Sequence, residues 1–181
     1  MNSLADNAIM LKVKSGDLDK MGLLFERYHR PLYGFLYRMT GEKEASEDMV
    51  QNVYYRMIRY RNTFTGDGEF KTWMYHLARN VVNDYFKKNK VRHQDVSEVE
   101  ARIGGGTLAD EEIQKQQEIN LLNNAIASLP EESREVLILS RYQELKYDEI
   151  AGILKISEGN VKVRVYRAIQ QLKSIYLKLE Q

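Results

Sequence analysis

The chain has no cysteine, three histidines and only two prolines, and each shortage narrows what the protein can be. Without cysteine, neither a disulfide framework nor a thiolate zinc site can form, and the chain cannot sense oxidants through thiols of its own. The histidines, His29, His76 and His93, are too scattered to make a good metal set. We therefore expect no bound metal and no cofactor.

Long apolar runs are also missing. No stretch of the sequence is apolar enough to cross a bilayer, and residues 1–19 lack the basic start and apolar middle of a signal peptide. Hydrophobic residues still make up 43% of the chain, which is enough to build packed cores. The sequence thus predicts a cytoplasmic protein without membrane insertion.

The motifs of common catalytic sites are absent as well. The sequence has no glycine-rich phosphate loop, no cluster of metal ligands, and no nucleophile paired with a base at a sensible spacing. We therefore predict no catalytic residue and no enzymatic activity.

What the chain does contain is a separation of charge along its length, hidden by a net charge of only +1. In residues 56–92 the basic side chains are opposed only by Asp67, Glu69 and Asp84, and residues 162–178 form a second basic segment. Acidic residues crowd the stretch between them, from 95 to 118. Two basic surfaces joined by an acidic connector are typical of a nucleic-acid-binding protein, although solvated helix faces give a similar pattern.

Apolar residues recur mostly at helical spacing, so we predict an all-α fold. It comprises two small helical domains joined by a flexible linker. The helices of the first domain are expected at about residues 18–39, 44–60 and 70–88. The linker is placed around the triplet Gly104, Gly105 and Gly106, because glycine-rich polar segments are flexible. The boundaries are residues 1–92 for the first domain, 93–112 for the linker and 113–181 for the second.

The second domain contains a predicted helix-turn-helix motif. Residues 147–154 form a short amphipathic helix, a tight turn follows at 155–156, and Ser157 is a strong N-cap for the next helix. The buried face of that helix is expected to hold Val161, Val165, Ala168 and Leu172. The opposite face carries Asn160, Val163, Arg164, Arg167 and Gln171. A polar, basic face of this kind suits the major groove of DNA, whereas an amphipathic hairpin with a solvated face is the structural alternative.

Three segments resemble a known family, the extracytoplasmic-function (ECF) sigma factors of the sigma-70 family. Residues 129–172 strongly resemble its region 4 and read LPEESREVLILSRYQELKYDEIAGILKISEGNVKVRVYRAIQQL. Residues 46–60, SEDMVQNVYYRMIRY, are similar to region 2.2, and residues 70–88, FKTWMYHLARNVVNDYFKK, to regions 2.3 and 2.4. The connector is too short for the middle domain of larger sigma factors. The resemblance implies a factor that binds core RNA polymerase, recognises the minus 35 and minus 10 promoter elements and promotes melting.

The resemblance also implies how the polymerase is bound. The helix at residues 44–60 would contact the clamp helices of the beta-prime subunit, and region 4 would dock on the flap of the beta subunit. The implied polymerase-binding residues are Asp48, Met49, Val50, Gln51 and Asn52. The family usually has an acidic residue where this chain has Asn52, so one charge contact would become a neutral hydrogen bond. Apolar residues at this spacing also suit a core, and for Val53 and Met57 we predict the core.

For promoter DNA, the resemblance implies two sets of contacts. The minus 10 set is Phe64, Phe70, Lys71, Asn80, Asp84, Lys87 and Lys88. The minus 35 set is Ser157, Asn160, Lys162, Val163, Arg164, Arg167 and Gln171. The first set combines cations with aromatic rings, which suits unpaired bases, because stacking gains about 1 to 3 kcal/mol per base. Trp73, Leu77 and Val81 lie at core spacing, and we expect them to be buried.

Factors of this family are commonly held inactive by an anti-sigma factor, so the resemblance also suggests such a partner. The main alternative function is a helix-turn-helix regulator whose N-terminal helical domain binds a partner. That alternative leaves the basic aromatic segment before residue 92 unexplained.

Overall fold

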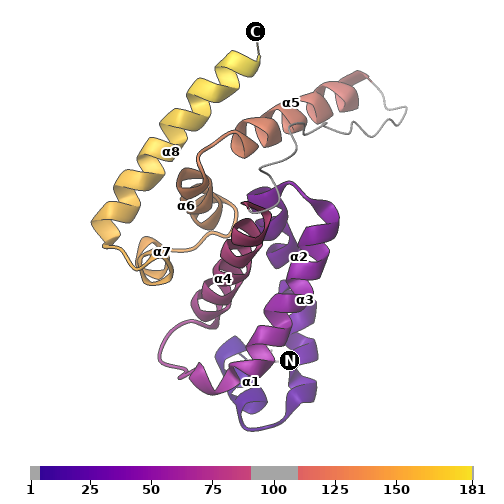
Figure 1. The fold of residues 1–181 in the computed structure, drawn as a ribbon, viewed down its shortest axis with the longest axis vertical. Coiled ribbons are helices and arrows are strands. Elements are labelled where there is room, and N and C mark those ends of the chain that lie inside the picture. The colour runs from indigo at the N-terminus through magenta and orange to yellow at the C-terminus, as the bar shows by residue number, and fades with distance from the viewer. Residues whose placement is uncertain (1–4, 91–109, 181) are drawn as a thin grey trace.

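The computed structural model describes residues 5–90 and 110–180, and within these ranges the protein is built of helices without strands (Figure 1). This confirms the all-α prediction. The first part contains α1 (Asp6–Lys14), α2 (Met21–Thr40), α3 (Lys43–Arg59) and α4 (Phe70–Lys90). The second contains α5 (Asp110–Ala127), α6 (Glu131–Arg141), α7 (Tyr147–Leu154) and α8 (Glu158–Leu179). The glycine triplet predicted as the linker lies outside the described residues.

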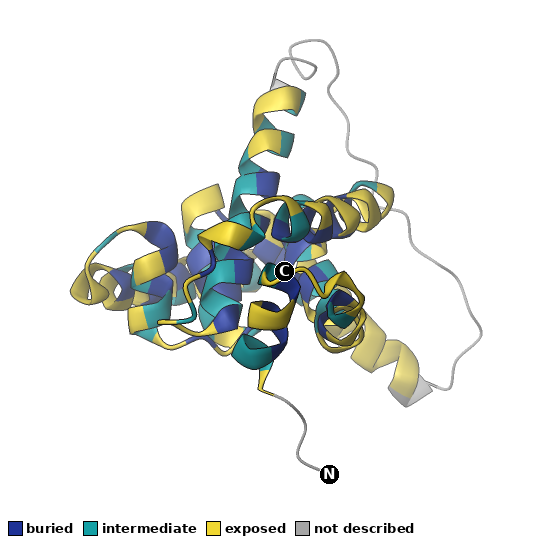
Figure 2. Cartoon of the chain, turned by 90° about the horizontal axis from the view of Figure 1, so that it is seen from below, coloured by how far each residue is buried: buried dark blue, intermediate teal, exposed yellow. Residues whose placement is uncertain are grey.

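Helices α2, α3 and α4 form the N-terminal bundle, and each contributes large apolar side chains to its centre. Phe35 of α2 meets Tyr75 of α4 edge-on, with ring centroids 5.5 Å apart. Val53 and Met57 of α3 are fully buried, as predicted. Exposed residues lie along the outer faces of the helices and buried ones where the helices cross (Figure 2). The bundle therefore presents polar outer surfaces on a closed apolar core.

Helix α1 was not expected, because residues 1–19 look polar. Three of its residues, Ile9, Met10 and Val13, are nevertheless fully buried against the bundle. Asn7 also accepts a hydrogen bond from the backbone amide of Phe70 at 2.8 Å and donates one to the carbonyl oxygen of Gly68 at 2.8 Å. Helix α1 thus fixes the loop that leads into α4.

The helix-turn-helix motif is formed by α7 and α8. Lys155 ends α7 in the left-handed conformation, with φ of 55°, and the backbone then enters α8. The Ser157 hydroxyl accepts a hydrogen bond from the amide of Asn160 at 3.2 Å, which confirms the predicted N-cap. Val161, Val165 and Ala168 are buried as predicted, whereas Leu172 is only half-buried.

The two parts of the chain pack directly on each other. Helix α7 lies against α4, and α5 and α6 lie against α2, so that buried apolar residues of both parts join one continuous cluster (Figure 1). Helix α7 also packs on α8. The two predicted DNA-reading helices, α4 and α8, are therefore separated by a single helix.

Candidate nucleic-acid interface

Helix α3 presents a polar face to solvent, and this face holds only part of the predicted polymerase-binding set. Asp48, Gln51 and Asn52 are exposed. Met49 and Val50 are only 5% and 8% exposed, because the helical period turns them toward the core with Val53. The structure therefore does not offer the side chains of Met49 and Val50 to a partner.

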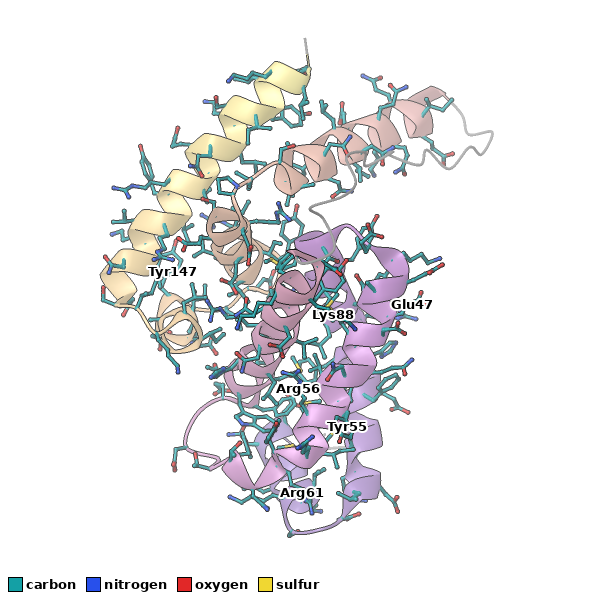
Figure 3. All side chains as sticks on the ribbon, viewed as in Figure 1. Glu47, Tyr55, Arg56, Arg61, Lys88 and Tyr147 are labelled. Atoms are coloured by element: carbon teal, nitrogen blue, oxygen red, sulfur yellow. The ribbon has the colours of Figure 1, made fainter. Side chains whose placement is uncertain are left out.

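The same face carries an aromatic residue that the sequence analysis missed. Tyr55 is 60% exposed and follows Asp48, Gln51 and Asn52 at helical spacing (Figure 3). The prediction took the contiguous residues 48–52, whereas a surface stripe on a helix recurs every three or four residues. That period, applied from Asp48, would have found Tyr55.

Between α3 and α4 lies an open cavity of about 630 Å³, and it collects three of the predicted minus 10 residues. These are Asn80, Asp84 and Lys87. The other lining residues are Arg56, Tyr60, Thr63, Trp73, His76, Leu77 and Asn83. The predicted burial holds for Val81, but Trp73 and Leu77 are only half-buried and line this cavity. The cavity thus combines carboxylate, amide, aromatic and cationic groups.

Arg56 ties the cavity to the exposed face of α3. Its Nη2 donates to Oδ2 of Asp84 at 2.7 Å, and its Nε donates to Oδ1 of Asn52 at 3.1 Å. Asn52 thus makes a neutral hydrogen bond within its own helix. Arg56 was noticed in the sequence only as one of many basic residues, and its position could not be read from local spacing because Asp84 is 28 residues away.

His76 also lines the cavity, and its ring nitrogen Nδ1 is buried without a hydrogen-bond partner in the described part of the chain. Burial lowers the pKa of His76, and the nearby positive charges of Lys155 and Arg79 lower it further. The ring is therefore kept neutral, in which state one of its nitrogens can accept a hydrogen bond.

The other four members of the predicted minus 10 set do not line this cavity. Phe64 and Phe70 are buried, and Phe64 packs edge-on against Trp73 with ring centroids 5.3 Å apart. The Lys71 ammonium donates to the backbone carbonyl of Gln143 at 3.4 Å, so it faces the C-terminal part. In this conformation the two rings are buried and support the loop before α4. Lys88 is exposed near the end of α4 (Figure 3).

Helix α8 brings most of the minus 35 set onto one outward face. Four of its residues are exposed, namely Asn160, Lys162, Val163 and Arg167. Val163 is 45% exposed, in agreement with its predicted position on the outward face. Arg164 lies 3.5 Å from the Glu132 carboxylate, and Gln171 accepts a hydrogen bond from the Ser133 hydroxyl at 2.7 Å. Ser157 is used as the N-cap. The free part of the face is thus the first half of the helix.

Tyr166, at 65% exposed, lies beside Arg167 on this face and was also missed. A tyrosine in a sequence of mixed helix residues carries no signal of its own. Its exposure follows from the burial of Val165 and Ala168 on one face of α8, because the helical period turns Tyr166 away from that face.

Among the described residues, no helix is long and apolar enough to span a membrane. Within the same ranges, no group of three or more histidine or acidic side chains is arranged to hold a metal ion.

Comparison with known protein families gives two matches, one in each part of the chain. Residues 24–92 match "Sigma-70 region 2", and residues 119–172 match "Sigma-70, region 4". The two matches contain the three segments that resemble regions 2 and 4, in the same order along the chain.

Curated relatives match over most of the chain. The ECF RNA polymerase sigma factor SigM of Bacillus subtilis is 32% identical over 84% of this chain and 93% of its own length. SigX of the same organism is 31% identical over 83% of this chain and 80% of its own length. The ECF RNA polymerase sigma-E factor of Escherichia coli K12 is 30% identical over 91% of both chains.

Two solved structures share the fold. CnrH, in a complex with the cytosolic domain of CnrY, is 20% identical and superposes with a TM-score of 0.73 over 95% of this chain and 97% of its own. RpoE of Bartonella quintana, in a complex with the anti-sigma factor NepR, is 21% identical with a TM-score of 0.71 over 89% of this chain and 98% of its own. From the two region matches and these relatives, we conclude that the chain belongs to the ECF sigma factors of the sigma-70 family and gives RNA polymerase its promoter specificity.

Proposed function

We propose that this sigma factor divides its work among three surfaces of the described structure. Residues 1–92 serve as region 2, residues 113–181 as region 4, and residues 93–112 connect them. The exposed face of α3 binds the polymerase, the cavity between α3 and α4 takes the minus 10 element, and the outward face of α8 reads the minus 35 element. The cavity is the observation that carries the proposal, because it joins separate sequence segments into one polar, aromatic-lined site.

At the minus 10 element, the cavity suits an unpaired base. Asn80 can donate and accept hydrogen bonds, and Asp84 has one carboxylate oxygen held by Arg56 and another that can accept a bond from a base. Trp73 provides a partly exposed aromatic surface, and Lys87 at the same cavity attracts phosphate. Capture of bases as they unpair drives melting without nucleotide hydrolysis, so the chain needs no catalytic activity of its own.

At the minus 35 element, the first half of α8 enters the major groove. Arg164 and Arg167 are suited to guanine edges, and the exposed methyl groups of Val163 to a thymine methyl. Tyr166 adds an aromatic contact that the sequence did not suggest. Lys162 lies on the flank and holds phosphate, which contributes affinity without sequence preference.

At the polymerase, Asp48 and Gln51 provide the polar anchors and Tyr55 a large exposed ring beside them. Aromatic residues flanked by polar groups are enriched in protein interfaces. The clamp helices of the beta-prime subunit are the expected partner of this face, and the beta flap is the expected partner of region 4. Because the polymerase and the promoter are in the cytoplasm, we place the protein there.

Replacement of Asp48 by Arg tests the polymerase surface. We expect core binding to weaken at least tenfold with an unchanged unfolding transition, because Asp48 is exposed to solvent in the described structure. The measurement is co-purification with core polymerase and mapping of transcription start sites. Replacement of Glu26 by Arg on α2 is the matched control, since it makes the same change in charge at another exposed position. Equal core binding by the Asp48 and Glu26 variants would refute the assignment.

We also propose that an anti-sigma factor regulates this chain. The supporting observation is that CnrH and RpoE, which share its fold, were each solved in a complex, the second one with an anti-sigma factor. The exposed face of α3 is the expected target, because an inhibitor bound there excludes the polymerase.

A further inference from the structure

The loop between α3 and α4 is held by side chains of α1. Residues 64–69 run as irregular backbone, so their polar groups depend on partners from other segments. Nδ2 of Asn7 donates to the carbonyl oxygens of Gly66 at 3.3 Å and Gly68 at 2.8 Å. Its Oδ1 accepts a hydrogen bond from the backbone amide of Phe70 at 2.8 Å. One side chain of α1 therefore ties the tip of the loop to the first residue of α4.

Two further residues of α1 continue this contact. Nζ of Lys14 donates to the carbonyl oxygen of Phe64 at 2.6 Å. Leu11 lies against the tip of the loop, because a Cβ atom at Gly66 would come 3.5 Å from its Cδ atoms. Lys14 follows Asn7 by about two helical turns, so both side chains lie on the same face of α1. This face thus holds the loop at both its start and its end.

Helix α1 is itself fixed to the bundle, so it can act as a support. Three of its residues are fully buried, namely Ile9, Met10 and Val13. The Asp6 carboxylate at its start accepts a hydrogen bond from Nη1 of Arg27 at 2.5 Å and another from the Tyr28 hydroxyl, both on α2. Burial and the bond to Asp6 raise the pKa of Tyr28, so the hydroxyl keeps the proton that it donates. The loop is therefore supported by α2 through α1.

The supported loop reaches the cavity assigned to the minus 10 element. Thr63, directly before Phe64, lines this cavity together with Trp73. Nε1 of Trp73 donates to the Thr63 hydroxyl oxygen at 3.2 Å. A shift of the Phe64 backbone would move Thr63 and release the Trp73 ring, which provides an aromatic surface of the cavity. The contacts of α1 therefore act on the cavity wall through the loop backbone.

We propose that Asn7 and Lys14 are positioning residues for base selection in the minus 10 element. They hold the loop so that Thr63 and Trp73 meet an unpaired base in a fixed geometry. Such support matters because a site selects its ligand only when other contacts keep its groups in place. The inference rests on the proposed function of the cavity. It extends promoter recognition to a helix that ends at Lys14, before the match to region 2 begins at residue 24.

Replacement of Lys14 by Met tests the support at the start of the loop. The assay selects open complexes, formed with core polymerase, from promoters with a randomised minus 10 element. At the position of strongest preference, we expect the enrichment of the preferred base to fall by about fivefold, the lower end of what one good base contact contributes. Lys12→Met is the matched control, since it removes the same charge from an exposed position of α1 and should keep the wild-type preference. A variant that is merely less stable forms fewer complexes on all promoters alike and leaves this ratio unchanged.

Replacement of Asn7 by Asp separates the loop from the start of α4. The carboxylate can still accept the hydrogen bond of the Phe70 amide, and its charge is favourable at a helix N-terminus. It cannot donate to Gly66 and Gly68, so the tip of the loop is released. We expect the base preference to fall as for Lys14→Met, while the thermal unfolding transition stays close to that of the wild type. Asn123→Asp, the same substitution at an exposed position of α5, is the matched control.

Asp84→Ala, measured in the same selection, separates this inference from the proposed function of the cavity. If Asp84→Ala lowers the base preference and both Lys14→Met and Asn7→Asp keep it, α1 does not position the site and the inference is wrong, although the cavity still reads the element. If none of the three variants changes the preference, the cavity does not read the minus 10 element, and the proposed function fails together with the inference.

Discussion

Helix α4 has two polar surfaces, and they differ in what their polar side chains contact. One surface, comprising Lys71, Tyr75 and Arg79 at intervals of four residues, is bonded to region 4. The other includes Asn80, Asp84 and Lys87 and lines an open cavity. A helix of similar residues along its length thus serves both as an internal interface and as a binding surface. The comparison shows that a residue's type alone does not decide its role, because packing of distant segments selects which face stays free.

The largest effect on stability is expected on the bonded surface. Replacement of Arg79 by Ala leaves Glu135 buried without its partner, which should lower the free energy of unfolding by about 2 kcal/mol, less than for a fully buried pair because Arg79 is partly exposed. Urea denaturation measures the change. Replacement of the pair together, Arg79→Met with Glu135→Leu, should recover most of the loss. A double variant as unstable as the single one would show that the ion pair is not the cause.

A smaller loss is expected from Tyr75→Phe. The change removes one hydroxyl and leaves Oε1 of the buried Gln143 without its donor, which costs about 1 kcal/mol. Thermal and urea unfolding should both show it. Tyr55→Phe on α3 is the matched control, because the ring of Tyr55 is mostly exposed and should change stability little. The same loss in both variants would argue against a special role for the Gln143 contact.

Substitutions on the open surface of α4 should impair promoter opening and leave stability nearly unchanged. Replacement of Asn80 or Asp84 by Ala should change the free energy of unfolding by less than about 0.5 kcal/mol, because neither side chain is buried. Open-complex formation should nevertheless fall more on duplex promoters than on templates already mismatched in the minus 10 element. Equal loss on the two templates would mean that these residues act through folding or general affinity.

Local signals predicted the helix-turn-helix motif well. The serine N-cap, the short turn and the apolar period of Val161, Val165 and Ala168 all lie within a dozen residues, and the structure confirms them. The same reasoning predicted Val53 and Met57 as core residues, and the structure buries both. Where a helix buries a single apolar stripe, the spacing of its apolar residues is enough to predict which side chains are buried.

The rest depended on segments far apart in the sequence. Tyr75 is fully buried and bonded to Gln143, which lies 68 residues later, so no local pattern could predict its role. Phe64 and Phe70 are predicted to contact DNA, and the structure buries both in a loop that α1 helps to hold. Helix α1 itself was missed because its three core residues stand among polar ones. Aromatic residues near cations suit both a core and a base-binding site, and only the tertiary packing distinguishes the two.

The smallest expected effect concerns His76, which lies between the two surfaces of α4. It lines the cavity, and the positive charges of Arg79 on α4 and of Lys155, which follows the end of α7, lie near its ring. Its pKa is lowered in the folded chain, chiefly by burial. Below about pH 6.5, the usual value, the unfolded chain takes up a proton that the folded chain resists. The free energy of unfolding should therefore fall as the pH decreases from 6.5 toward the lowered pKa.

The measurement that isolates this effect is the difference between the wild type and His76→Gln in urea unfolding between pH 5 and 7.5. Glu135 acts in the opposite sense, because its raised pKa favours the fold as the pH falls toward its own titration. It is present in both proteins, so its contribution cancels in the difference. The variant should lose less stability on acidification than the wild type. Parallel pH profiles would show that the fold does not lower the pKa of His76.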